Sequence, residues 1–145
     1  MYKAIDIARK ILGRATDEDS GELVSNLKLQ KLLYYMQGYH LAFFDTPLFG
    51  DPIEAWMYGP VVPSVFDAFK GYGRAGIEYT GGTVTLSDEE ESLFSRVYDI
   101  YSRYSAYGLM ELTHSEEPWK STPAGRGNVI PLAVIRDFFK TKVEP

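Results

Sequence analysis

Apolar residues recur at three- and four-residue steps between residues 26 and 44, and this segment constrains the fold more than any other. The repeating positions are Leu29, Leu32, Leu33, Met36, Tyr39 and Phe43. This spacing predicts one helix over residues 26–44 at the centre of the core. Ser25 or Asn26 can cap its start, and Thr46-Pro47 is expected to end it. Four side chains are expected largely on its other faces: Lys28, Lys31, Tyr34 and Gln37.

Five shorter helices are predicted from apolar spacing and from residues that start or end helices. Residues 5–12 have helical spacing, and Gly13 suits the end of that helix. Pro63 and Pro131 each fit the first turn of a helix, where the missing N–H does no harm. Two serines start the others. Ser87 begins a capping-box motif ahead of a stripe of Leu93, Val97, Ile100 and Tyr104, and Ser105 starts a shorter helix that Pro118 closes.

Strands are predicted in two places, and both are short. Residues 53–58 alternate moderately and favour a strand that ends in a turn at Gly59-Pro60. Residues 77–80 and 83–86 flank Gly81-Gly82, a pattern typical of a hairpin. Residues 115–130 are expected to form an exposed loop. The sequence thus predicts a mainly α (α+β) fold: one compact domain over residues 1–145, with about six helices, a short strand and a hairpin.

Composition excludes several classes of protein. The chain has 145 residues, 45% of them hydrophobic and 24% charged, which is typical of a globular domain. It has no cysteine, which excludes disulfide scaffolds and thiolate metal sites. The net charge of −5 argues weakly against a nucleic-acid partner. No secretion signal and no long apolar run is present, so we expect a cytoplasmic protein without a membrane partner.

Motifs for catalysis or cofactor binding are weak. The spacing G-x-G-x-x-G occurs over residues 71–76, but it follows a predicted helix rather than a strand, so no cofactor is expected. His40 and His114 lack metal-site spacing. One enzymatic alternative remains open, a small hydrolase that uses His114 with Glu116 or Glu117. No catalytic or metal-binding residue is assigned.

A nucleic-acid-binding regulator is the other alternative. Lysines, arginines and tyrosines are interleaved along the chain, which is a suitable mixture for contacts to single strands. The basic residues concerned are Lys3, Arg9, Lys10, Lys28 and Lys31. No helix-turn-helix pair or ribonucleoprotein motif accompanies them.

Two further segments combine tryptophan with proline, and each favours a rigid corner. The first is AWMYGPVVP at residues 55–63, and the second is LTHSEEPW at residues 112–119. Proline restricts the backbone and tryptophan supplies a large amphipathic surface, so such corners can bind a partner at small ordering cost. A purely structural role in fixing turns fits these residues equally well.

Four segments, in order, resemble the signatures of the Panacea domain family, the SocA-like and GepA-like phage-associated proteins. They are residues 27–40 (LKLQKLLYYMQGYH), residues 47–63 with PLF and EAWMYGPVVP, residues 86–90 (LSDEE) and residues 113–119 (THSEEPW). The resemblance covers nearly the whole chain, about residues 2–140. It implies one Panacea-like domain.

The resemblance also implies an antitoxin that neutralises a cognate protein toxin by direct binding. At least one relative is a proteolytic adaptor, so an ATP-dependent protease is a second partner to consider. No cofactor or catalytic residue is implied. A homodimer is compatible with the chain's 11 tyrosines, since tyrosine is enriched at interfaces.

We expect the central helix and the two tryptophan segments to lie on one side of the domain and to bind the toxin there. Aromatic side chains would contribute most of the affinity, and lysines would orient an acidic partner. The candidate toxin-binding residues are Lys28, Lys31, Tyr35, Trp56, Tyr58, Pro60, His114 and Trp119.

Overall fold

The computed structural model describes residues 1–18 and 22–143. Within these residues the chain forms seven α-helices, one 3-10 helix (η1) and two antiparallel pairs of short strands, which confirms the mainly α class. The elements in chain order are α1 (Ala4–Asp17), β1 (Val24–Ser25), α2 (Asn26–Phe44), β2 (Glu54–Trp56), β3 (Gly59–Val61), α3 (Pro63–Phe69), η1 (Lys70–Tyr72), β4 (Gly76–Ile77), α4 (Asp88–Tyr101), α5 (Ala106–His114), α6 (Glu117–Lys120) and α7 (Leu132–Val143).

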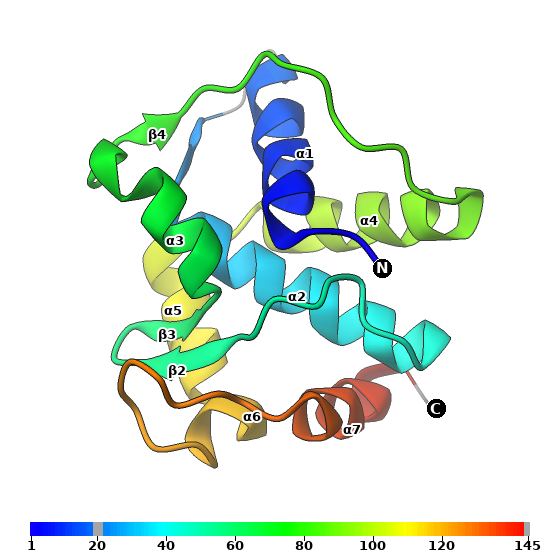
Figure 1. Ribbon diagram of the computed structural model, residues 1–145, viewed down its shortest axis with the longest axis vertical. Coiled ribbons are helices and arrows are strands. Elements are labelled where there is room, and N and C mark those ends of the chain that lie inside the picture. The colour runs from blue at the N-terminus through cyan, green and yellow to red at the C-terminus, as the bar shows by residue number, and fades with distance from the viewer. Residues whose placement is uncertain (19–21, 144–145) are drawn as a thin grey trace.

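Helix α2 runs through the middle of the molecule, and α1, α4, α5 and α7 surround it (Figure 1). Its predicted bounds are confirmed, and the Ser25 side chain caps it by accepting from the Lys28 backbone N–H. The helix ends at Phe44 because Asp45 takes a left-handed conformation, with φ of 59°.

Burial of α2 on nearly every side corrects one expectation. Lys31, Tyr34 and Gln37 are all buried, although their polar groups suggested a face away from the core. Neighbouring elements satisfy these polar groups, as buried polar groups require. For example, the Gln37 amide nitrogen donates to the Phe49 carbonyl oxygen at 2.7 Å, and the Gln37 amide oxygen accepts from the Leu48 N–H at 2.7 Å.

Helix α7 packs closely against α2 because Gly38 has no side chain. A Cβ atom built at Gly38 would lie 2.2 Å from ring atoms of Phe139, so any larger residue would displace that ring. Phe139 is fully buried, and its ring also packs edge-on against Tyr34 at 5.3 Å. The sequence NLKLQKLLYYMQGYHLAFF of α2 thus includes one glycine whose absence of a side chain brings two helices together.

Most predicted helix starts are confirmed, but some ends and faces are wrong. Ser87 forms a capping box with Glu90, Ser105 caps α5, and Pro63 lies in the first turn of α3. Helix α1 continues through Gly13 to Asp17, because Gly13 is buried within the helix against the loop that carries Thr83. Pro118 does not close α5. It lies in the first turn of a separate helix, α6, inside the stretch that was expected to be loop.

The buried face of α4 is displaced from the predicted stripe. Phe94, Val97 and Tyr98 are buried, whereas Ile100 is 55% exposed. Tyr104, the last residue of the predicted stripe, lies beyond the end of the helix and is 41% exposed. Helix α4 therefore leaves part of its apolar side uncovered.

The strands pair differently from the prediction. No hairpin forms across Gly81-Gly82; Ile77 pairs with Val24, which is distant in sequence, and residues 83–86 are not in a strand. The hairpin lies instead between β2 and β3, where Trp56 pairs with Gly59 and the turn is Met57-Tyr58. The predicted turn at Gly59-Pro60 is wrong by two residues, because both residues belong to β3.

Among the helices that the structure describes, none is both long enough and apolar enough to span a bilayer.

Candidate partner-binding surface

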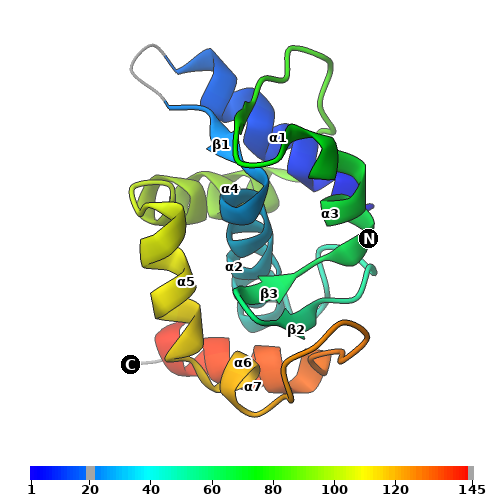
Figure 2. The ribbon, with the colours of Figure 1, turned by 90° about the vertical axis from the view of Figure 1, so that its left-hand side faces the viewer.

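The β2–β3 hairpin projects beside α5, α6 and the loop before α7 (Figure 2). On its outer edge, β2 is bonded to that loop. The Ala55 N–H donates to the Asn128 carbonyl oxygen at 2.9 Å, and the Gly125 N–H donates to the Ala55 carbonyl oxygen at 2.7 Å. The hairpin is therefore fixed on both edges of β2, which limits its motion relative to the helices.

Met57 and Tyr58, the two turn residues, form what we call the hairpin tip. Their exposed fractions are 69% and 60%, among the largest of the large apolar side chains in the described residues. Tyrosine and methionine are both enriched at the cores of protein–protein interfaces. The tip therefore presents two side chains of interface type on a turn of defined conformation.

The two tryptophans lie together next to the hairpin tip. The indole Nε1–H of Trp119 in α6 donates to the Trp56 carbonyl oxygen at 2.7 Å, so a hydrogen bond directly joins the two tryptophan segments. His114 stacks on the Trp119 ring, with centroids 4.0 Å apart, and Phe66 packs edge-on against Trp56 at 5.1 Å. Both tryptophans and His114 are half-buried. They form an aromatic flank beside the tip.

Arg126, which was not among the predicted residues, covers the Trp56 ring. Its guanidinium lies 4.9 Å from the ring centroid and also pairs with Asp67 at 2.9 Å. A cation over an indole face is attracted by the ring quadrupole. Arg126 follows Trp56 by seventy positions in a loop, so no local sequence pattern could have indicated this contact.

Lys31 and Tyr35 do not belong to the exposed surface. Both side chains are fully buried, and Pro60 is buried as well, so the expectation that they face a partner is corrected. The Lys31 Nζ donates to the Pro60 carbonyl oxygen at 3.1 Å, and within the described residues Lys31 takes part in no ion pair. Burial lowers the pKa of the Lys31 ammonium to about 7. Lys31 thus supports the hairpin from beneath.

Gly59 shows how closely Lys31 approaches the hairpin. Its φ is +113°, a conformation that side chains other than glycine's rarely adopt. A Cβ at Gly59 would lie 2.5 Å from the Lys31 Cε and 2.9 Å from the Thr113 Oγ1. Glycine at this position therefore satisfies both the turn and the contact beneath it.

Glu116 is a second buried charged group near the hairpin. Its two carboxylate oxygens accept from the hydroxyls of Tyr34 and Tyr35, each at 3.0 Å. Burial raises the pKa of the Glu116 carboxyl to about 7, although both hydrogen bonds and the charge of Lys142 act to lower it. We refer to Lys31, Tyr34, Tyr35 and Glu116 as the supporting layer. Glu116 entered the sequence analysis only as a hydrolase carboxylate, because its sequence position does not show that it is buried.

Lys28 lies apart from this surface. Its Nζ donates to the Ser102 carbonyl oxygen at 2.6 Å, at the junction between α4 and α5. There it lines a separate hollow of about 490 Å³. Burial lowers the pKa of Lys28, while Glu22 and Glu18 oppose that change.

Comparison with known proteins places the chain in a family. Residues 29–120 match the family model described as "Antitoxin SocA-like, Panacea domain". The chain is also 31% identical over 137 residues to "Antitoxin SocA" of Caulobacter vibrioides (strain NA1000 / CB15N), covering 81% of this chain and 72% of the relative. No solved structure matches the chain.

The chain belongs to the SocA-like antitoxin family with a Panacea domain. Membership in an antitoxin family implies a cognate toxin as partner and indicates a regulatory rather than an enzymatic role. The matched residues contain the hairpin tip, both tryptophans, Lys31 and Glu116, whereas α1 and α7 lie outside the match.

The surroundings of His114 differ from those of a catalytic base in a hydrolase. The His114 Nε2 is buried without a hydrogen-bond partner in the described residues, and the nearby Glu116 carboxylate is bonded to two tyrosines instead. A base oriented by a third group, as in a hydrolase triad, is therefore not assembled among those residues. Nor do the described residues include a group of three His, Cys, Asp or Glu side chains placed to hold a metal ion.

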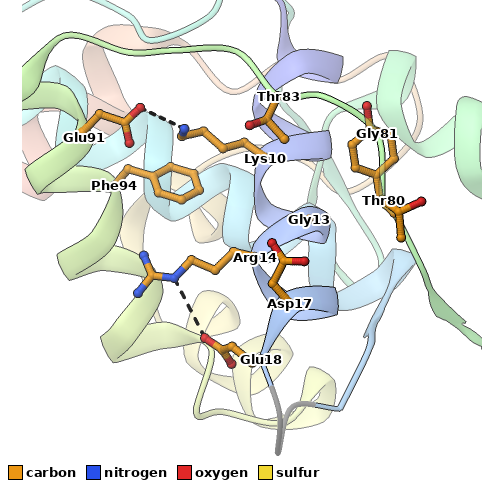
Figure 3. Close-up of a pocket in the computed structure, with 11 residues that line it drawn as sticks. Lys10, Gly13, Arg14, Asp17, Glu18, Thr80, Gly81, Thr83, Glu91 and Phe94 are labelled. Atoms are coloured by element: carbon orange, nitrogen blue, oxygen red, sulfur yellow. Dashed lines mark ion pairs between the residues drawn. The ribbon is translucent and has the colours of Figure 1, made fainter.

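Three of the five basic residues suggested for nucleic acid are engaged within the protein, whereas Lys3 and Arg9 are exposed. Lys31 is buried, Lys28 donates to a carbonyl, and Lys10 pairs with Glu91 at 2.8 Å. Lys10 lines a hollow of about 440 Å³ between α1, α4 and the loop around Thr83 (Figure 3). Arg14 in the same hollow pairs with Asp99 at 2.7 Å. These two cations are already neutralised by carboxylates, so they are poorly placed to bind phosphates.

Proposed function

We propose that this chain neutralises a cognate protein toxin by binding it directly, with the hairpin tip at the centre of the interface. The observation that carries the proposal is the exposure of Met57 and Tyr58 on a turn whose preceding strand is bonded to Trp119. Interface energy concentrates in a few central aromatic and similar side chains, surrounded by contacts that exclude water. The half-buried flank of Trp56, Trp119 and His114 supplies such surroundings.

The supporting layer contributes by holding the tip in place before the toxin arrives. Lys31 bonds to the Pro60 carbonyl, and Tyr35 bonds to Glu116 one turn before Trp119. A surface that is ordered in the free protein loses less entropy on binding. In this proposal Lys31, Tyr35 and Pro60 are therefore positioning residues, and Lys28 lies outside the interface.

A growth test combined with tip variants examines the proposal. Each reading frame that flanks the gene is induced alone and together with this chain, and a frame that stops growth only when alone is the toxin. Co-expression of a Met57→Asp/Tyr58→Asp variant with that toxin should fail to restore growth, because two carboxylates would be buried at the centre of the interface. The purified pair should bind at least about a hundredfold more weakly by calorimetry.

Tyr72→Asp is the matched control, because Tyr72 is 47% exposed on η1, outside the hairpin. That variant should restore growth like the wild type. Neutralisation by the folded tip variant at wild-type level would contradict the proposal. Immunoblots of the toxin add a distinction, since binding alone keeps the toxin at full level and delivery to a protease removes it.

A further inference from the structure

Among the residues that the structure describes, none covers an apolar groove along the C-terminal half of α2. Helix α2 forms its floor, and α4 and α7 form its walls, since both pack against α2. The hollow measures about 300 Å³, and its apolar lining comes from Tyr39, Phe43, Leu93, Val97, Ile100 and Val143. Phe43 is 49% exposed and Ile100 is 55% exposed. Apolar side chains exposed together in a hollow with a polar rim can bind the apolar face of a partner.

Stacked aromatic rings beneath the groove make its floor rigid. Tyr101 stacks on Tyr35 with centroids 4.0 Å apart, and its hydroxyl is bonded to that of Tyr39 at 2.7 Å. Tyr39 also packs edge-on against Phe139 at 4.9 Å. The groove is therefore formed without a partner and does not depend on closure of a loop.

The charged residues of the groove are all cationic. Arg96 lies on the α4 wall and Lys142 on the α7 wall, and the lining drawn from residues 1–18 and 22–143 includes no carboxylate. Within residues 1–18 and 22–143, neither cation forms an ion pair. The chain as a whole has a net charge of −5, so this cationic rim differs from the average of the molecule.

We propose that this groove binds an amphipathic helix of a partner protein, with apolar side chains against α2 and carboxylates facing Arg96 and Lys142. A floor helix with two flanking helices offers the ridges and grooves into which one further helix packs. The two cations on opposite walls select acidic residues on both edges of that helix. A second copy of this chain fits poorly, because a symmetric contact would place the same cationic rim against itself.

This site shares no residue with the hairpin tip, so it can be tested independently of the proposed toxin interface. The probe is a synthetic, fluorescently labelled helical peptide with a leucine stripe flanked by glutamates. A matched peptide carries lysines in place of the glutamates. Fluorescence anisotropy measures both dissociation constants with the full chain.

We expect the glutamate peptide to bind at least about tenfold more tightly than the lysine peptide. Ile100→Glu should weaken the glutamate peptide at least about tenfold, and Arg96→Glu should reverse the preference between the peptides. Ile100→Asn replaces Ile100→Glu if the latter fails to fold. The tip variant Met57→Asp/Tyr58→Asp should leave peptide binding unchanged.

Three results of the binding measurements would overturn the inference. They are equal affinity for the two peptides, no binding of either one, and binding that neither groove variant alters. Light scattering that shows a dimer, lost in Ile100→Glu, would also overturn it by assigning the groove to a second copy.

Discussion

The supporting layer and the hollow around Lys10 both combine aromatic rings with charged side chains, and they differ in how the charge is satisfied. In the hollow, Lys10 and Arg14 pair with carboxylates at 2.8 and 2.7 Å, and these side chains remain partly exposed to solvent. In the supporting layer, Lys31 and Glu116 are buried and bonded to a carbonyl and to two hydroxyls. Exposed ion pairs contribute little to stability, whereas a buried charge is costly unless its surroundings are fixed.

This difference shows where the chain is least tolerant of change. The hollow, at about 440 Å³, is larger than the groove along α2, at about 300 Å³, and both of its cations are paired with carboxylates. The supporting layer lies in the buried interior, yet its Lys31 is hydrogen-bonded directly to the hairpin that carries the exposed tip.

The largest predicted difference between the two regions concerns their glutamates. Glu116→Ala should lower the free energy of unfolding by about 3 kcal/mol, because the buried hydroxyls of Tyr34 and Tyr35 lose their acceptor. Glu91→Ala in the hollow should cost about 1 kcal/mol or less. Urea unfolding measures both. Glu116→Gln retains one carbonyl oxygen and should cost less than Glu116→Ala; an Ala variant as stable as the wild type would contradict the role given to Glu116.

A smaller effect is expected where the hairpin contacts the supporting layer. Gly59→Ala should cost about 2 kcal/mol, since it combines a strained φ with a close approach to Lys31. Gly73 has a φ of +57° and a ψ of −125°, a conformation that side chains rarely adopt, and open space around it, so Gly73→Ala should show backbone strain alone, about 1 kcal/mol. Thermal unfolding of the two variants separates the cost of backbone strain from the cost of the close approach to Lys31. Equal losses would show that Lys31 does not restrict the hairpin.

Titration of Lys31 should make the free energy of unfolding depend on pH. Its pKa of about 7 in the folded state lies below the ordinary value of 10.5. Between these pH values the folded state therefore binds fewer protons than the unfolded state. Stability therefore rises with pH across this window, by at most about 1.4 kcal/mol per pH unit from this one group. Urea unfolding at about pH 7.5 and 9 should show the rise in the wild type and a smaller rise in Lys31→Met. A Lys31→Met slope equal to the wild type would contradict the burial of the ammonium.

The smallest effect is expected for Arg14. Arg14→Ala removes an exposed ion pair with Asp99 and a contact over the Tyr98 ring, and should cost about 0.5–1 kcal/mol. The loss should shrink in about 0.5 M salt, because salt screens exposed charges. A loss as large as that of Glu116→Ala would remove the distinction between the two regions.

Local signals in the sequence predicted the helices well and the strands poorly. The α2 stripe, the Ser87 capping box and Pro63 act within one or two helical turns, so they could be read directly from the sequence. Ile77 pairs with Val24, which is distant in sequence, instead of with residues 83–86. The Gly81-Gly82 pattern is local, so it could not indicate this alternative partner strand. Gly13 suggested a helix end, but packing against Thr83 overrides its weak propensity.

The candidate site was predicted in part for the same reason. Its aromatic members stood out as Trp-Pro segments, and the structure joins those segments through the Trp119 indole. Lys31 and Tyr35 were placed on the surface because polarity alone does not distinguish an exposed lysine from one bonded to a buried carbonyl. Met57 was missed as an exposed residue because the turn was expected two positions later, at Gly59-Pro60.

Site-specific photocrosslinking shows directly whether the toxin binds at the hairpin tip. A photoreactive amino acid is placed at Tyr58, and in separate variants at Tyr72 and Phe43, in cells that express the toxin identified by the growth test. All three side chains are exposed, so each variant should fold. We predict a crosslink to the toxin from position 58 and none from position 72. Crosslinks from position 72 or 43 with none from position 58 would contradict it, because the toxin would then bind elsewhere than the hairpin tip.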